Sequence, residues 1–203
     1  MFLDFEKLEP KSRYKLITAS IVPRPIALVT TRNKDGSINA APFSFFNVFS
    51  EDPPLVVLGL QTKPDKSLKD TTSNIRNTGE FVVNLVDDKM AEKMVVCAAD
   101  YPKGESEPVH AELNLSQSKK INVDYITESP FSFECKRITV LQFSNTRDLA
   151  IGEIMGMHAR KSLIDLKNYH VNWRKYHPIG RLFASHYIYT DNTLSMKIPP
   201  VKK

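Results

Sequence analysis

The sequence predicts a mainly β fold, a barrel with a few short helices, and three observations lead to this prediction. Short apolar runs recur along the chain and are separated by turn-forming residues, a pattern typical of strands. Strand and helix patterns do not alternate regularly, which disfavours a doubly wound parallel sheet. No Gly-x-Gly-x-x-Gly fingerprint of a dinucleotide-binding fold occurs, and the chain has only 7 glycines.

The first predicted element is a β-hairpin. Residues 26–31 form a β-branched apolar run, Asp-Gly at 35–36 is a strong hairpin turn, and residues 38–46 should pair back antiparallel. Counting outward from a two-residue turn at 35–36 places Arg24 roughly opposite Asn47. The hairpin would thereby bring an arginine beside the end of its second strand.

A strand and a helix are predicted next. Residues 55–60 form a continuous apolar strand after an Asp-Pro-Pro turn. A helix is expected over residues 67–78, because Ser67 and Asp70 resemble a capping pair and Gly79 is well placed to end the helix.

The second half of the chain contains further strands and one long loop. Residues 100–112 are polar, include two prolines and a glycine, and are expected to form a surface loop. A structureless connection of this length is uncommon, which favours a role as a lid or a dimer contact. The other predicted elements are a short amphipathic helix over 88–98 and strands over 81–86, 131–143, 149–158 and 183–189.

Length and composition indicate one globular domain over residues 1–203. The chain is long enough to bury a sizeable core, expected at about 17–190 with a tail over 191–203, and its 41% hydrophobic and 25% charged residues are ordinary. No apolar run approaches the roughly 20 residues of a membrane helix, and the first residues lack the pattern of a secretory signal. We therefore expect a cytoplasmic protein without a membrane partner.

Charge and metal-ligand patterns exclude two further classes. The formal net charge is +5, but acids interleave with the lysines and arginines, and exposed aromatic-basic alternation is missing, so no nucleic-acid partner is expected. Cys97 and Cys135 lack a Cys-x-x-Cys spacing and are expected to be reduced and buried. The histidines within 170–186 have Asp165 as their one nearby acid, so no metal site is expected.

The most informative segment is NAAPFSFFNVFSEDPPLVVLGL at 39–60, followed by a cationic helix start. Ser44, Phe45 and Phe46 offer backbone amides and flat apolar walls to a ring. Taken singly, these elements are explained by core phenylalanines, a turn and a solvated helix start, but their ordered combination favours a site for a phosphorylated aromatic cofactor. The residues that could hold its phosphate are Ser50, Lys66, Lys69, Thr71 and Thr72.

In these segments the sequence resembles the flavin-reductase-like family of FMN-binding split barrels. The resemblance is strong over 17–86 and weaker to about 190, where PIGRLFASHYIY is similar to the family's closing segment. The matching features are PRPIALVTT at 23–31, Asn-x-Ala-Pro-Phe-Ser-x-Phe-Asn at 39–47, Asp-Pro-Pro at 52–54, Lys-Asp-Thr-x-x-Asn-Ile at 69–75 and Phe-Val-Val-Asn at 81–84.

The resemblance implies an FMN-binding split β-barrel with a few short helices, and hydride transfer from NAD(P)H to flavin N5. It also implies a homodimer with its flavin near the subunit interface, and a partner oxygenase or another acceptor for the electrons. Because a flavin carries the chemistry itself, no acid–base pair is expected. The cofactor-binding candidates are Arg24, Ser44, Phe45, Phe46, Asn47, Ser50, Lys66, Lys69, Thr71, Thr72, Asn74 and Arg181.

Several alternatives stay open at this level. Arg24 and Arg181 are the best-placed arginines for the negative charge of a reduced flavin or its phosphate, whereas Thr71, Thr72 and Asn74 are explained equally well by helix capping. A non-catalytic FMN-binding protein would have the same barrel, and a pyridoxamine-phosphate-oxidase-like enzyme would share the architecture. The Asn-Ala-Ala-Pro-Phe-Ser turn favours the reductase-like branch.

Overall fold

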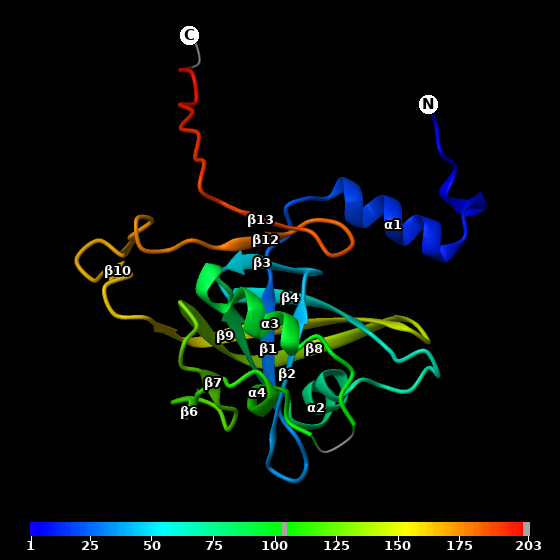
Figure 1. The fold of residues 1–203 in the computed structure, drawn as a ribbon, viewed down its shortest axis with the longest axis horizontal. Coiled ribbons are helices and arrows are strands. Elements are labelled where there is room, and N and C mark those ends of the chain that lie inside the picture. Colours follow the sequence, from blue (N-terminus) through cyan, green and yellow to red (C-terminus); the bar gives the residue numbers. More distant parts are fainter. Residues whose placement is uncertain (103–104, 201–203) are drawn as a thin grey trace.

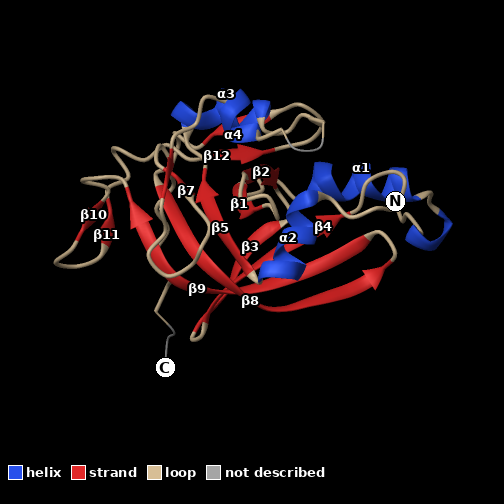
Figure 2. Ribbon diagram, turned by 90° about the horizontal axis from the view of Figure 1, so that it is seen from below, coloured by secondary structure: helices blue, strands red, loops and turns tan. Residues whose placement is uncertain are grey.

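The computed structural model describes residues 1–102 and 105–200, so two residues of the predicted loop and 201–203 of the predicted tail lie outside the described residues. At its centre a seven-stranded antiparallel sheet, in the order β2-β1-β5-β8-β9-β4-β3, curls into a barrel (Figure 1; Figure 2). Its strands are β1 (Ala27–Arg32), β2 (Ile38–Phe43), β3 (Phe46–Glu51), β4 (Pro54–Gln61), β5 (Glu80–Leu85), β8 (Phe131–Ser144) and β9 (Arg147–Ala159).

The two edge strands of this sheet are neighbours in the chain. Strand β2 ends at Phe43 and β3 begins at Phe46, so only Ser44 and Phe45 lie between them. Within the described residues β2 pairs with β1 alone and β3 with β4 alone. The barrel is therefore split along the line where β2 and β3 meet, which we call the seam.

Apolar side chains cover both faces of the central strands. Val29 of β1 and Phe81 of β5 are fully buried inside the barrel. On the outer face of β1, Leu28 belongs to a second buried cluster with Met90 and Met94. Burial on both faces explains why these strands are continuous apolar runs in the sequence.

Helices lie outside the barrel. Helix α2 packs on it through the fully buried Ile75 and is followed by Gly79 at a φ of 71°, a left-handed conformation that glycine adopts without strain. No helix among the described residues has the length and apolar character needed to cross a bilayer. The helices are α1 (Pro10–Ser20), α2 (Asp70–Thr78), α3 (Ala91–Val96) and α4 (Glu107–His110), with 3₁₀ turns η1 (Phe5–Lys7) and η2 (Asp88–Met90).

Small two-stranded sheets complete the described structure. An isolated bridge between Arg24 and Arg181 joins the most C-terminal of these sheets to the segment just before β1. Their strands are β6 (Leu115–Ser116) with β7 (Tyr125–Ile126), β10 (Ile164–Asp165) with β11 (His170–Val171), and β12 (Ile179–Arg181) with β13 (Tyr187–Tyr189).

The mainly β prediction is confirmed, and each predicted strand is present within a few residues of its expected bounds, although the last one is only β13. The helix predicted over 88–98 is present as η2 and α3, and the loop predicted over 100–112 contains the short α4. Helix α1 was not predicted, because its sequence has no apolar stripe and most of its residues are exposed. Cys97 and Cys135 are both buried and unpaired, as expected.

The predicted start of α2 is wrong. The hydroxyl of Ser67 donates to the Asp65 carboxylate at 2.6 Å within a tight turn, so it cannot cap a helix. Helix α2 begins three residues later, at Asp70, with Lys69 as its N-cap residue.

The predicted hairpin register is also wrong. Arg32 pairs with Ile38, so five residues, 33–37, connect β1 and β2 instead of two. Strand β2 ends at Phe43, and Asn47 belongs to β3, where it pairs with Val57 of β4. Arg24 therefore does not face Asn47.

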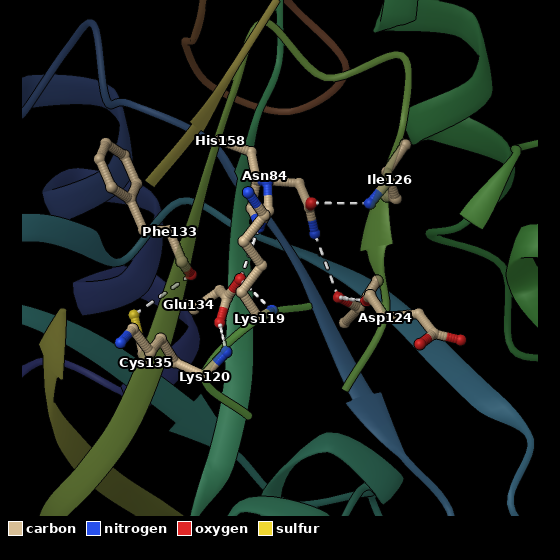
Figure 3. A network of polar contacts seen from close by, with 10 residues as sticks. Asn84, Lys119, Lys120, Asp124, Ile126, Phe133, Glu134, Cys135 and His158 are labelled. Atoms are coloured by element: carbon tan, nitrogen blue, oxygen red, sulfur yellow. Dashed lines mark hydrogen bonds and ion pairs between the residues drawn. The ribbon is translucent and has the colours of Figure 1, made fainter. Parts of the chain in front are cut away.

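The buried carboxylate of Glu134 holds the segment between β6 and β7 against the sheet through hydrogen bonds (Figure 3). Glu134 of β8 accepts hydrogen bonds from the backbone N–H groups of Lys119 (2.7 Å) and Lys120 (2.6 Å) and from His158 Nε2 (2.5 Å). The His158 ring stacks on Tyr125 at 3.9 Å. Burial by itself would raise the pKa of Glu134, but these donors outweigh it and lower the pKa below its ordinary value of 4.5.

We expect Glu134→Gln to lower the free energy of unfolding at pH 7 by about 2–4 kcal/mol, because one of the amide donors that now meets the buried carboxylate would then face an NH₂ group. A lowered folded pKa stabilises the protein above the unfolded value, and this contribution is lost as the pH falls through the folded value. The difference between wild type and variant should therefore shrink below pH 4.5 in urea titrations. The exposed Glu51→Gln is the control, and a difference independent of pH would contradict the assignment.

Candidate functional site

An open cavity of about 500 Å³ lies beside the seam, and this volume is in the usual range for small-molecule sites. Residues of α1, the seam, the start of α2 and the loop after α3 surround it. Its lining residues are Tyr14, Asn39, Ala41, Pro42, Phe43, Ser44, Phe45, Gly59, Gln61, Lys63, Pro64, Lys69, Asp70, Thr71, Cys97, Ala98, Ala99, Asp100, Tyr101 and Glu107.

Strand β2 lines the cavity with Asn39, Ala41 and Phe43, which share one face because strand side chains alternate. Asn39 Nδ2 donates to Oγ1 of Thr71 at 2.9 Å and to Oγ1 of Thr31 at 3.3 Å. Thr71 is therefore the acceptor in its bond with Asn39, and its own hydroxyl proton remains available to a ligand in the cavity.

The same buried network fixes α2 to the first hairpin. Asn74 Nδ2 donates to Thr31 Oγ1 at 3.0 Å and to Asn33 Oδ1 at 2.7 Å. Because Thr31 lies on β1 and Asn33 follows it, a shift of α2 would break these bonds and leave buried polar groups unpaired. The start of α2 is thereby held beside the cavity.

The seam residues have unpaired backbone amides. In the described part of the chain, neither the N–H of Ser44 nor that of Phe45 has a hydrogen-bond acceptor. The position of Phe45 depends on Gly59, whose N–H donates to the Phe45 carbonyl at 2.7 Å. A Cβ on residue 59 would lie 2.8 Å from the Phe45 Cβ, so only glycine permits this close approach.

Positive charge and helix amides gather at the start of α2. Lys63 and Lys69 line the cavity, and no side chain caps the helix at Lys69. The first amides of an α-helix, here at Asp70, Thr71 and Thr72, have no intrahelical acceptor. The helix dipole adds positive potential at this end. This part of the cavity suits an anion.

Carboxylates and one thiol also line the cavity. Glu107 accepts a hydrogen bond from the Ala40 N–H at 3.0 Å, and burial raises the pKa of its carboxyl. Burial likewise raises the pKa of the Cys97 thiol to about 12, which argues against a nucleophilic thiolate. Asp100 is exposed, and its carboxylate lies 3.9 Å from Lys69 Nζ.

Aromatic rings form the walls of the cavity. The ring centroids of Tyr14 and Phe45 are 6.3 Å apart. Tyr101 stacks on His110 with centroids 4.2 Å apart, which orients the ring of Tyr101 in the loop after α3. Flat apolar walls of this kind suit an aromatic ligand. No three His, Cys, Asp or Glu side chains in the described ranges are grouped to hold a metal ion.

Four sequence-predicted residues come together in this lining, namely Ser44, Phe45, Lys69 and Thr71. The others lie elsewhere, so their contact with a cofactor stays a prediction. Those outside the lining are Arg24, Phe46, Asn47, Ser50, Lys66, Thr72, Asn74 and Arg181.

The surroundings of four residues outside the lining can be described. Phe46 packs against the barrel core, and the Asn47 side chain accepts a hydrogen bond from the Val48 N–H at 2.9 Å. Lys66 occupies a turn with a φ of 69°. Thr72 is buried.

Arg24 is buried, and backbone carbonyls occupy most of its guanidinium. Its Nη1 donates to Thr18 at 2.5 Å and Ile21 at 2.8 Å, its Nη2 donates to Leu182 at 2.6 Å, and its Nε donates to Ser44 Oγ at 3.3 Å. Arg24 therefore ties α1 and the closing segment to the seam.

Most of the lining was missed in the sequence. Asn39 and Phe43 lie in the informative segment, where the two-residue period of a strand could have placed them on one face with Ala41. Tyr14 and Tyr101 come from a helix and a loop that carry no recognisable motif. Tyr101 does belong to the loop for which a lid role was expected.

Comparisons with known proteins identify what the chain is similar to. The family model for the flavin reductase like domain matches residues 19–180. The structure of 2-nitrobenzoate 2-nitroreductase NbaA from Pseudomonas fluorescens is 38% identical, with a TM-score of 0.91, and the match covers 100% of this chain and 98% of that one. Nitrilotriacetate monooxygenase component B from Bacillus cereus is 31% identical, with a TM-score of 0.90 and coverage of 97% and 98%. A Shewanella frigidimarina chain with a split barrel domain shares the fold at 20% identity, with a TM-score of 0.83 and coverage of 98% and 100%.

The two candidate arginines should differ sharply in their effect on stability. Arg24→Met removes bonds to three buried or half-buried carbonyls, and we expect the free energy of unfolding to fall by about 3 kcal/mol. Arg181 lies over the Tyr187 ring, 4.5 Å from its centroid, so Arg181→Met should cost about 0.5–1 kcal/mol. Urea denaturation followed by tryptophan fluorescence measures both. Equal losses would contradict the structural role given to Arg24.

Proposed function

Since the chain belongs to the family defined by the flavin reductase like domain, we propose that it is an FMN-binding oxidoreductase that takes hydride from NAD(P)H onto flavin N5. The observation that carries this proposal is the presence, in one cavity, of unpaired seam amides and a cationic helix start. These two features match the two chemically different ends of FMN.

The start of α2 fits the phosphate end. A phosphate monoester carries close to two negative charges at pH 7. Lys63 and Lys69 supply countercharge, the first helix amides supply donors, and the Thr71 hydroxyl has a proton to give because Asn39 already donates to it. The lysines, the helix amides and the Thr71 hydroxyl could therefore all bind the phosphate group of FMN.

The seam fits the ring end. The N–H groups of Ser44 and Phe45 are donors for acceptor atoms on the edge of a flavin, and the side chains of Tyr14 and Phe45 offer flat apolar surface. When bound, FMN would supply the two-electron chemistry. The protein's part is to bind and orient it.

Arg24 is a positioning residue in this proposal. It does not line the cavity, but its Nε donates to Ser44 Oγ at 3.3 Å, so its charge acts on the seam through that hydroxyl. A fixed positive charge there would stabilise negative charge developing on a bound ring. The backbone amides of the seam make the direct contacts.

The electron acceptor is proposed from two solved structures that are more than 30% identical to this chain. One is a nitroreductase acting on 2-nitrobenzoate, and the other is a component of nitrilotriacetate monooxygenase. We propose that this chain passes electrons either to a small nitroaromatic acid or to a partner oxygenase. An electron-transfer flavoprotein role would use the same site.

We also propose a homodimer with the flavin close to the interface. Phe45, which lines the cavity, is 39% exposed, and Val48 and Phe49 on the adjoining edge strand are 66% and 69% exposed. Ile17 of α1 and Ile21, which directly follows α1, are exposed as well. Apolar patches of this extent on a soluble chain mark interaction surfaces.

Removing the positive charge at position 69 should weaken the binding of FMN but not the binding of riboflavin. A charge-assisted hydrogen bond contributes roughly 1.5–3 kcal/mol, so Lys69→Met should raise the Kd for FMN about tenfold or more. Lys66→Met is the matched control, because Lys66 does not line the cavity and should change the Kd less than about threefold. Fluorescence titration measures the affinities of the wild type and both variants for FMN and for riboflavin. An equal loss for both ligands would show that Lys69 does not bind the phosphate.

The oxidoreductase proposal is tested by following NADH and NADPH oxidation with added FMN. We expect one or both nicotinamides to be oxidised only when FMN is present. A second assay, with oxygen excluded, uses 2-nitrobenzoate as the electron acceptor. A protein that binds FMN but oxidises neither nicotinamide would be a non-catalytic FMN-binding protein. Oxidation of pyridoxamine phosphate in place of NAD(P)H would support the other alternative.

A further inference from the structure

A second hollow, of about 320 Å³, lies between α3 and β13. Tyr187, Ile188 and Tyr189 all line it, facing Met94 and Val95 of α3. Ile179 of β12, which pairs with Tyr189, lines it as well, so the hollow lies against the β12–β13 pair and runs along β13. We call it the β13 groove.

One edge of β13 is unpaired. In the described residues β13 has one neighbouring strand, β12, which occupies its other edge. An unpaired edge exposes backbone donors and acceptors that readily accept a further strand. The apolar surface of α3 beside it would cover one face of such a strand.

The segment that follows β13 has the pattern of a strand but no surface to pack on. Leu194, Met196 and Ile198 alternate with Ser195 and Lys197, and these three apolar residues are 80%, 80% and 94% exposed. Apolar side chains at every second position are typical of a strand with one buried face. Residues 191–200, which we call the tail, instead extend away from the rest of the structure (Figure 1).

Two contacts hold the root of the tail beside the start of β12. The Thr190 hydroxyl donates to the Pro178 carbonyl at 2.7 Å, and the Asp191 carboxylate lies 3.9 Å from His177 Nδ1. Pro178 directly precedes β12, so these contacts hold the start of the tail near the edge of β13 that β12 already occupies. The other edge of β13 has no partner among the described residues.

We propose that the β13 groove binds the tail of a second copy, which adds as a strand to the edge of β13 and packs its three apolar side chains against the groove. Charge also matches, because the chain from Asn192 onward carries lysines and no acid, whereas Glu92 stands at the groove. In a two-fold dimer each copy gives one tail and receives one. The inference rests on the proposed homodimer but not on its flavin chemistry.

Disulfide trapping between two differently tagged chains tests where the tail lies. One chain carries Val95→Cys and the other carries Met196→Cys, and the mixture is oxidised gently. We expect a covalent product near twice the 23.1 kDa of the chain, containing both tags. In the control, Lys34→Cys, in the turn between β1 and β2, replaces Val95→Cys and should give no mixed product.

The other outcomes overturn the inference. A single chain carrying both cysteines that closes on itself, with no mixed product, would show that the tail folds back onto its own groove. A wild-type dimer in sedimentation equilibrium without trapping would refute the tail placement while keeping the dimer. A wild-type monomer would refute both.

Deleting the apolar face of the tail gives an independent measurement. The triple change Leu194→Ser, Met196→Ser and Ile198→Ser should raise the dimer dissociation constant about tenfold or more, because each side chain loses its apolar burial. Ser195→Ala, on the other face of the tail, is the matched control. An unchanged dissociation constant in the triple variant would contradict the proposal.

Discussion

The two-residue connection between β2 and β3 constrains the whole structure. Seven strands spaced about 4.8 Å apart would place the edges of a flat sheet about 29 Å from each other. The three Cα steps from Phe43 to Phe46 span at most about 11 Å. Since β2 and β3 are those two edges, the sheet must curl until they meet, and Ser44 and Phe45 must lie where it closes. Their backbone amides remain unpaired because neither strand extends through them.

The two ends of the cavity are held by different means. At the seam, the close approach of Gly59 to Phe45 sets the position of an aromatic wall. At the start of α2, the amides of Asn39 and Asn74 both donate to Thr31, which fixes the helix to the first hairpin. Strand β2 takes part in both ends, so the distance between the aromatic wall and the cationic helix start is set by one strand. A rigid support of this kind preorganises a site.

Much of the fold could be predicted from the sequence, but only part of the site. Apolar runs identified the strands because burial dominates their composition, and a motif identified Ser44, Phe45, Lys69 and Thr71. Arg24 was proposed from a hairpin register that proved wrong and Asn74 from the motif at the start of α2, and nothing in the sequence indicated the bonds that they make to backbone carbonyls and neighbouring side chains. Tyr14 and Tyr101 could not be found, since tertiary packing alone brings a terminal helix and a distant loop to the cavity.

The closure of the sheet has a consequence for folding. The edge strands are adjacent in the chain, yet the order of the sheet places between them strands that extend to Ala159. Contacts of such long sequence separation form late, because the loops that they close must be ordered first. The cavity beside the seam is therefore complete only in the fully closed barrel, and a partly folded chain has no site. Any ligand that binds there therefore stabilises the closed barrel, because it binds the native state alone and shifts the folding equilibrium toward that state.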